Sequence, residues 1–244
     1  MDPIKAFQLE REGNIKKLGK NKELKKIAEN FIIKSSKIKY VYNFNWLGRP
    51  IIQFPQEIVA IQEIIWSVKP DLIIETGIAH GGSIILSASI LELIGKNGLV
   101  VGIDIDIRKH NKKLIKAHFL FKRIRMLEGS SIDMDIYNQA KKITQDKKKV
   151  MVFLDSNHTY NHVWQELCLY SKLVSKNSYI VVFDTVTEII PKEISKNRPW
   201  GKGNNPKTAV DRFLRENKNF VVDKNINNKL LITTNPGGYL KKIS

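Results

Sequence analysis

A stretch of twelve residues, LIIETGIAHGGS at positions 72–83, restricts the fold of this chain more than any other part of it. An apolar run typical of a buried strand ends in Glu75. Glycines then interrupt the pattern, and residues 84–94 resume it as an apolar helix. Strand, glycine turn and helix form the place where open α/β sheets hold a cofactor, because glycines allow close approach and the helix start offers free N–H groups. The stretch therefore predicts a cofactor site on an α/β domain.

Two cofactors fit a turn of this kind, and the spacing of the glycines separates them. A dinucleotide requires G-x-G-x-x-G, whereas the pattern here is Glu75-x-Gly77-x-x-x-Gly81-x-Ser83. An acid at the strand end repels a pyrophosphate but suits the amino group of S-adenosylmethionine. The turn therefore favours S-adenosylmethionine, held by Glu75, Gly77, Gly81 and Ser83, while a purely structural connection between strand and helix stays open.

Strands and helices alternate from residue 72 onward, which predicts an α/β fold with a doubly wound, mainly parallel sheet. The seven expected strands cover residues 72–75, 99–104, 124–127, 150–155, 179–184, 220–222 and 230–233. The last two strands are expected to form an antiparallel hairpin at the C-terminal end of the sheet, with residues 225–228 at its turn.

The N-terminal part differs in composition from the rest of the chain. Residues 1–45 are rich in lysine, and apolar side chains at helical spacing predict one amphipathic helix around residues 24–32. Residues 43–55 are expected to form a loop. We therefore expect a helical extension over residues 1–45, followed by a single α/β domain at residues 46–244.

The bulk composition limits the partners and the location. The net charge is +17, the one cysteine excludes an intrachain disulfide, and no run approaches the ~18 apolar residues of a membrane span. Nucleic acid, an anionic membrane face and an acidic small substrate each fit this charge. Because the lysines are scattered and outnumber the arginines, an anionic metabolite or a lipid-linked glycan fits better than nucleic acid. A cytoplasmic protein is expected, with peripheral contact to the inner membrane face and homo-oligomers left open.

Four of the expected strands end in an acid, and parallel strands bring their ends to the same edge of a sheet. These acids are Glu75, Asp104, Asp155 and Asp184. Asp104 follows the second strand, where a carboxylate can accept both ribose hydroxyls of an adenosine. Ser131 and Asp133 follow the third strand, and they are expected either to contact the adenine or to cap the next helix.

The acids after the fourth and fifth strands are a candidate metal site. If these strands are neighbours, Asp155 and Asp184 lie side by side, and a pair of carboxylates suits a hard divalent ion such as Mg²⁺. His158, three residues after Asp155, is expected at the start of the next helix as a general base toward a substrate hydroxyl. His162 lies one helical turn further. A structural role for either histidine stays open.

A long glycine-rich segment, NRPWGKGNNPK at residues 197–207, is expected to lie beside this edge of the sheet as a mobile lid. Its Arg198, Trp200, Lys202 and Asn204 suit an anionic or sugar substrate. These side chains, with His162, are therefore the candidate substrate contacts.

These motifs together resemble those of a known family. The glycine turn, VMVFLDSNH and VVFDT are similar to class I S-adenosylmethionine-dependent methyltransferases. LDSNHTYNHVWQEL and RPWGKGNNPKTAV resemble the cephalosporin hydroxylase-type family, which includes rhamnosyl O-methyltransferases. The resemblance covers residues 45–240. It implies a Rossmann-like fold and an O-methyltransferase acting on a sugar or other hydroxylated small molecule, in glycan or natural-product biosynthesis.

The metal-dependent catechol O-methyltransferase plan is also similar, and it implies roles for single residues. Asp155 and Asp184 match the acids that hold Mg²⁺ there, Thr185 stands where that plan has an amide ligand, and His158 occupies the position of the base. Alternatives from other classes stay open: an RNA methyltransferase, a nicotinamide-dependent oxidoreductase, and a non-catalytic basic module that binds nucleic acid or a membrane.

Overall fold

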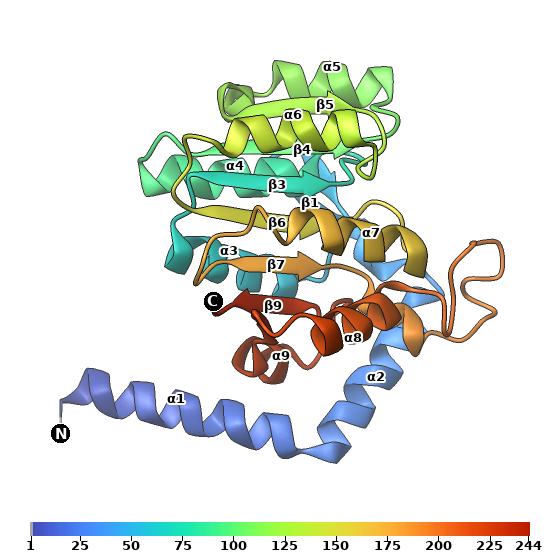
Figure 1. Ribbon diagram of the computed structural model, residues 1–244. Coiled ribbons are helices and arrows are strands. Elements are labelled where there is room, and N and C mark those ends of the chain that lie inside the picture. The colour runs from blue at the N-terminus through green and yellow to red at the C-terminus, as the bar shows by residue number, and fades with distance from the viewer. Residues whose placement is uncertain (1) are drawn as a thin grey trace.

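The computed structural model describes residues 2–244, and the centre of this part of the chain is a sheet of seven strands (Figure 1). The strand order is β5-β4-β3-β6-β7-β9-β8. The bounds are β3 Leu72–Thr76, β4 Leu99–Asp104, β5 Ile124–Glu128, β6 Val150–Leu154, β7 Tyr179–Val182, β8 Phe220–Val222 and β9 Tyr239–Lys242. The first five strands in this order, β5, β4, β3, β6 and β7, are parallel to one another. Strand β9 is antiparallel to both of its neighbours, β7 and β8. The predicted doubly wound, mainly parallel sheet is confirmed.

Helices cover both faces of this sheet, because apolar side chains along each buried strand point alternately to one face and the other. Ile73 and Met151 pack on the face covered by α3, α4 and α5, whereas Ile74 and Val152 pack under α6, α7 and α8. The bounds are α3 Pro55–Val68, α4 Gly82–Ile94, α5 Lys109–Ala117, α6 Met134–Thr144, α7 Tyr160–Tyr170 and α8 Pro206–Glu216, with 3₁₀ helices η1 Tyr40–Asn43, η2 Phe119–Arg123 and η3 Thr185–Glu188.

The strand order reverses at β3, which lies between β4 and β6, and such a reversal opens a crevice at the carboxyl ends of the strands. In the register of the sheet, Thr76 lies opposite Ile103 on one side and Leu154 on the other. The residues that follow these three positions therefore emerge together. This alignment brings the ends of three strands to one site.

The C-terminal region differs in detail from the prediction. Antiparallel strands are present, but the second one is β9, and the assignment of residues 230–233 to a strand was wrong. The expected turn at residues 225–228 belongs to helix α9, Lys224–Leu230. The side chain of Asp223 starts this helix by accepting the N–H groups of Asn225 and Ile226, and Leu230 buries itself against the core.

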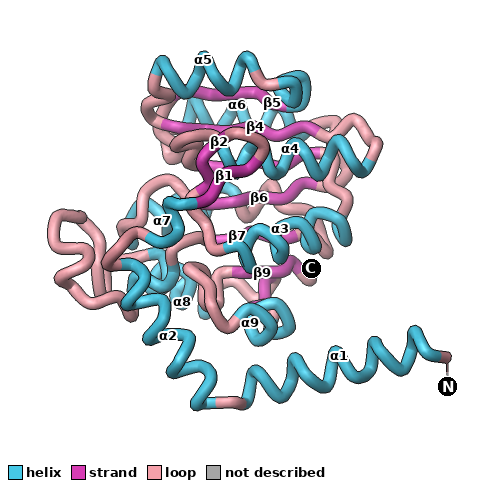
Figure 2. The backbone as a smooth tube through the Cα atoms, turned by 180° about the vertical axis from the view of Figure 1, so that it is seen from behind, coloured by secondary structure: helices cyan, strands magenta, loops and turns pink. Residues whose placement is uncertain are grey.

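The N-terminal region contains two helices rather than the one that was expected. Helix α1 spans Pro3–Lys20 and α2 spans Lys22–Ser36, with Asn21 ending the first and capping the second. Helix α1 extends along the outside of the domain beside α9 (Figures 1 and 2). The expected loop at residues 43–55 contains a small hairpin, β1 Phe44–Trp46 and β2 Arg49–Ile51. Within residues 2–244, no helix is both long and apolar enough to cross a bilayer.

Candidate active site

The glycine turn after β3 is held tightly between the neighbouring strands. Gly77 has φ +90°, its N–H donates to the Ile103 carbonyl, and a Cβ at this position would collide with the main-chain carbonyl of Asp155. Gly81 has φ +88° and forms the N-cap of α4. These values lie in the left-handed region that favours glycine. The turn is therefore a close crossing of main chains at the end of β3.

Glu75 lies buried under this turn, with a relative exposure of 2%. The Ser83 hydroxyl donates a hydrogen bond to its Oε1 atom, while Oε2 has no partner among residues 2–244. Burial raises the pKa of Glu75 to about 8, and the hydrogen bond from Ser83 only partly opposes this rise. An unpartnered buried carboxylate oxygen is a place where a cation or an N–H donor is favoured.

The raised pKa of Glu75 makes the stability of the cofactor-free protein depend on pH. Its folded-state pKa of about 8 lies above the ~4.3 of an unfolded chain, so this contribution to stability is fully present below about pH 4 and is lost as the pH rises through 8. Glu75→Gln cannot ionise and is expected to raise the free energy of unfolding near pH 9 by about 3–5 kcal/mol. Near pH 4 the two proteins should unfold alike.

Urea unfolding near pH 4, 7 and 9 measures this difference, since denaturant midpoints report stability directly. Glu29→Gln, at an exposed position on α2, is the matched control, and it should follow the wild type at every pH. A Glu75→Gln variant that parallels the wild type from pH 4 to pH 9 would contradict the raised pKa.

Asp104 binds the glycine turn directly. Its Oδ2 atom accepts the N–H groups of Ile78 at 2.7 Å and Ala79 at 3.2 Å, and its Oδ1 atom accepts the N–H of Asp106 at 3.2 Å. The carboxylate therefore shapes the turn. Three of its roughly four lone-pair sites are used, and the one that remains, on Oδ1, can accept a further donor.

A cavity of about 290 Å³ lies between the ends of β3, β4 and β6. It is lined by Gly77, Ala79, Ile103, Asp104, Ile105, Ser130, Ser131, Asp155, Ser156, Asn157 and His162. The lining thus includes the turn, the acid after β4 and the acid after β6. Asp133 is exposed and caps α6 by accepting the N–H of Asp135, which is the alternative that its position in the sequence left open.

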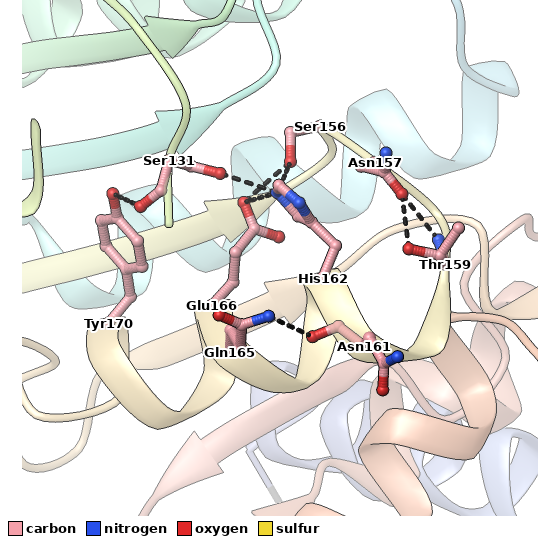
Figure 3. A network of polar contacts seen from close by, with 9 residues as sticks. All are labelled: Ser131, Ser156, Asn157, Thr159, Asn161, His162, Gln165, Glu166 and Tyr170. Atoms are coloured by element: carbon pink, nitrogen blue, oxygen red, sulfur yellow. Dashed lines mark hydrogen bonds and ion pairs between the residues drawn. The ribbon is translucent and has the colours of Figure 1, made fainter. Parts of the chain in front are cut away.

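His162 forms one wall of this cavity and is the centre of a polar network (Figure 3). Its Nε2 atom lies 2.9 Å from the Ser131 hydroxyl, 3.1 Å from the Ser156 hydroxyl and 3.6 Å from Oε1 of the fully buried Glu166. The Ser156 hydroxyl donates to the same Glu166 oxygen at 2.8 Å. The structure therefore places His162, an expected substrate contact, beside Ser131 on the cavity between β3, β4 and β6.

Three side chains that could hold a metal ion converge next to this cavity. Ligand atoms of Asp155, His158 and Asp184 all lie within 4.8 Å of one another, and His158 Nε2 is 3.5 Å from Asp184 Oδ2. Burial raises the pKa of Asp155 well above its usual range, and the negative charge of Asp184 raises it further. A divalent cation would remove this penalty, so the donor set fits a hard ion such as Mg²⁺.

The remaining expected metal ligand, Thr185, lies in a different environment. Its hydroxyl donates to the Pro236 carbonyl at 3.0 Å, and the side chain is buried. Asp184 itself has φ +53°, and its main-chain N–H donates to Oδ1 of Asn235 at 3.0 Å. Asn235 thus positions the Asp184 carboxylate from the loop before β9, 51 residues further along the chain. Local patterns carry no signal of this contact.

A second residue that sequence reasoning missed is Gln53, just after β2. It is 3% exposed, and its Oε1 atom has no partner among residues 2–244. It lines a small cavity of about 50 Å³ together with Gly77, Ser83 and Asp155. An unpartnered buried amide oxygen at this place is a further candidate acceptor for a ligand donor. The hint available in the sequence is a polar residue inside an apolar segment, at residues 51–54.

The expected lid packs onto the cluster formed by Asp155, His158 and Asp184. The Trp200 ring meets the His158 ring edge-on, with 4.8 Å between centroids, and the Arg198 guanidinium lies 5.3 Å from the centroid of the same Trp200 ring. Asn204 accepts the N–H of Tyr160 and donates to the Pro199 carbonyl, so its side chain fastens the loop to the start of α7.

Residues 38–243 of this chain match the family model described as "Rhamnosyl O-methyltransferase/CmcI". Together with the fold, this match defines the class of protein: the chain is an S-adenosylmethionine-dependent O-methyltransferase. The chain belongs to this family. The nicotinamide-dependent oxidoreductase and the non-catalytic basic module, both kept open above, are thereby excluded.

The similar proteins agree with this family. The rhamnosyl O-methyltransferase of Mycobacterium bovis (strain BCG / Pasteur 1173P2) is 30% identical over 184 residues, which are 73% of this chain and 70% of that protein. The Mycobacterium leprae rhamnosyl O-methyltransferase is 27% identical over 182 residues, covering 72% of this chain and 73% of that protein.

Solved structures share the fold at low sequence identity. A CmcI structure described as containing Mg and SAM has a TM-score of 0.57 at 15% identity, covering 83% of this chain and 78% of that one. The Bacillus cereus O-methyltransferase in complex with SAH has a TM-score of 0.51 at 14% identity, covering 79% of this chain and 80% of that one.

Proposed function

We propose that this enzyme transfers the methyl group of S-adenosylmethionine to a hydroxyl of a sugar or a similar small molecule, with help from Mg²⁺. One observation carries this proposal: Asp155 both lines the cavity at the strand ends and belongs to the cluster with His158 and Asp184. The methyl donor in the cavity and the hydroxyl that accepts the methyl group at the cluster would therefore meet at the Asp155 carboxylate. The names of the mycobacterial relatives support a sugar as acceptor.

The cofactor side of the site uses residues around the glycine turn. Glu75 and Ser83 lie under the turn, and the free Glu75 oxygen suits the amino group of the methionine part. Gly77 and Gly81 allow the main chain to approach that part closely. Asp104 would accept a ribose hydroxyl with the lone pair that remains on Oδ1.

The adenine side of the site is formed by the network around His162. Its imidazole and the Ser131 hydroxyl line the same cavity as Asp104, and both offer polar atoms to an adenine edge. We therefore assign His162 to the cofactor side, in place of the substrate contact expected from the sequence. Asp133 acts as the cap of α6.

The acceptor side of the site is formed by Asp155, His158 and Asp184. Bound S-adenosylmethionine would supply the methyl group, and Mg²⁺ on the two carboxylates would lower the pKa of the acceptor hydroxyl as a Lewis acid. His158 would take the hydroxyl proton, a role worth roughly 10²–10⁴-fold in rate. Its position 3.5 Å from the Asp184 carboxylate stabilises the imidazolium that forms. Trp200 packs against the same imidazole and would exclude water from it.

Isothermal titration with S-adenosylhomocysteine tests the cofactor part of this proposal. The wild type should bind it, and Asp104→Ala should weaken binding by about 10–100-fold, because the carboxylate contributes a charge-assisted hydrogen bond to a ribose hydroxyl. Asp106→Ala, two residues further on and exposed, should bind like the wild type. Equal losses in both variants, or no binding by the wild type, would contradict the assignment, and thermal melts of each variant exclude unfolding as the cause.

A further inference from the structure

A third and larger cavity is lined by Trp200, the side chain that contacts His158. Its volume is about 860 Å³, and its walls come from residues 188–202, between η3 and α8. Trp200 lines this cavity while its ring contacts His158, so this one side chain borders both the cavity and the proposed acceptor site. The cavity therefore lies next to that site.

The charge of this larger cavity is strongly positive. Its lining contains four cations: Lys192, Lys196, Arg198 and Lys202. Within residues 2–244, none of the four forms a salt bridge with an acid, whereas other basic side chains of the chain do. Unpaired cations converging on a concave surface favour an anionic ligand.

The one acid in this lining offsets only part of the positive charge of the four cations. Glu188 accepts the Gly203 N–H at 2.9 Å and an Asn205 amide N–H at 2.6 Å through Oε2. Burial raises the pKa of Glu188, but these hydrogen bonds and the positive charges of Lys202 and Lys207 outweigh the effect of burial, and the pKa lies below its ordinary value. Glu188 thus stays charged while it holds the loop, and the lining has four cations against this one carboxylate, a surplus of three positive charges.

The cations and their positions suggest the kind of anion. Arginine presents a planar fork that matches the oxygens of a phosphate, and lysines bind phosphates as point charges. The Arg198 guanidinium lies 5.3 Å from the centroid of the Trp200 ring, the same ring that contacts His158. A neutral sugar would leave these charges unpaired, while a diphosphate carries enough charge and oxygens to engage several of them.

We propose that the acceptor carries a phosphate or diphosphate group, as a glycosyl phosphate or nucleoside diphosphate sugar does, and that this larger cavity binds it. The proposal rests on the proposed function, because it places the acceptor hydroxyl at Asp155, His158 and Asp184. It makes the cavity a second anchor that orients the sugar by its anionic end.

Titration with inorganic pyrophosphate tests the cavity without knowledge of the sugar. The wild type should bind it, and Lys192→Gln combined with Lys202→Gln should weaken binding by on the order of 100-fold, since each lysine provides a charge-assisted contact. The matched control is Lys141→Gln combined with Lys142→Gln at the end of α6, which removes the same charge. Equal weakening in both double variants would mean a general charge effect and would overturn the proposal.

A competition experiment then separates the phosphate from the sugar. Glucose 1-phosphate should displace pyrophosphate from the wild type, whereas methyl glucoside at the same concentration should not. Titration of every variant with S-adenosylhomocysteine keeps the two proposals apart. If the wild type binds S-adenosylhomocysteine but neither pyrophosphate nor glucose 1-phosphate, the proposal of an anionic acceptor is overturned. The methyltransferase proposal then stays intact. If the wild type does not bind S-adenosylhomocysteine, that result would overturn the proposed cofactor site instead.

Discussion

Asp184→Asn is expected to lower the rate of Mg²⁺-stimulated methyl transfer by at least about 10³-fold, because a Lewis-acid metal contributes several kcal/mol to such a reaction. The substitution removes one carboxylate from the cluster that contains Asp155 and His158. It leaves the fold in place, since asparagine tolerates the left-handed conformation at this position, φ +53°. The main-chain hydrogen bond to Asn235 is also unaffected.

Affinity for S-adenosylhomocysteine should stay nearly unchanged in Asp184→Asn, because Asp184 lies outside the lining of the cofactor cavity described above. The measurement combines turnover at several Mg²⁺ concentrations with titration of S-adenosylhomocysteine. Asp135→Asn, an exposed carboxylate on α6, is the control and should match the wild type in both. Cofactor affinity that falls as far as turnover would contradict the separate roles assigned to the cavity and the cluster.

Gly77→Ala should abolish binding of S-adenosylhomocysteine and lower the free energy of unfolding by about 2–5 kcal/mol, the sum of backbone strain and overpacking. Gly77 has φ +90°, and its added Cβ would meet the main-chain carbonyl of Asp155. A main-chain neighbour cannot move aside as the end of a side chain can. The ends of β3 and β6 would therefore separate, and the cavity between them would change shape.

Two other glycines separate the strain from the collision. Gly48 has φ +83° with nothing within 4 Å of an added Cβ, so Gly48→Ala should cost only the strain, about 1–2 kcal/mol. Gly81 has φ +88° and would meet the end of the Ile115 side chain at 2.7 Å, so its cost should lie between the other two. Urea unfolding of the three variants gives the order, and equal costs at Gly48 and Gly77 would contradict the crossing of main chains.

The predictable part of the fold rests on short-range patterns. The apolar strands end in acids, and the alternation of strands and helices requires a mainly parallel sheet. The prediction failed at residues 224–230, where Asp223 caps a helix that the sequence reading treated as a turn. It also missed α1, because that helix has no buried residue and so carries a weak apolar pattern. The first failure thus concerns a local helix cap that was not recognised, and the second concerns a helix without a buried face.

The candidate site divides in the same way. Glu75, Gly77 and Asp155 follow strands directly, so their position at one edge could be expected from strand ends alone. Asn235 and Gln53 were missed, because each reaches the site from a loop whose path depends on tertiary packing. The domain boundary near residue 45, the oligomeric state and the cellular location stay predictions.

The sequence by itself determined which residues lie at the carboxyl edge of the sheet, because strand periodicity and glycine turns are local properties of the chain. Only the tertiary structure decided how those residues divide the work. The strand order placed β6 beside both β3 and β7, so Asp155 serves the cavity as well as the metal cluster. The folded loop at residues 188–202 created the cationic cavity. Such groupings depend on packing between distant segments, which no local pattern encodes.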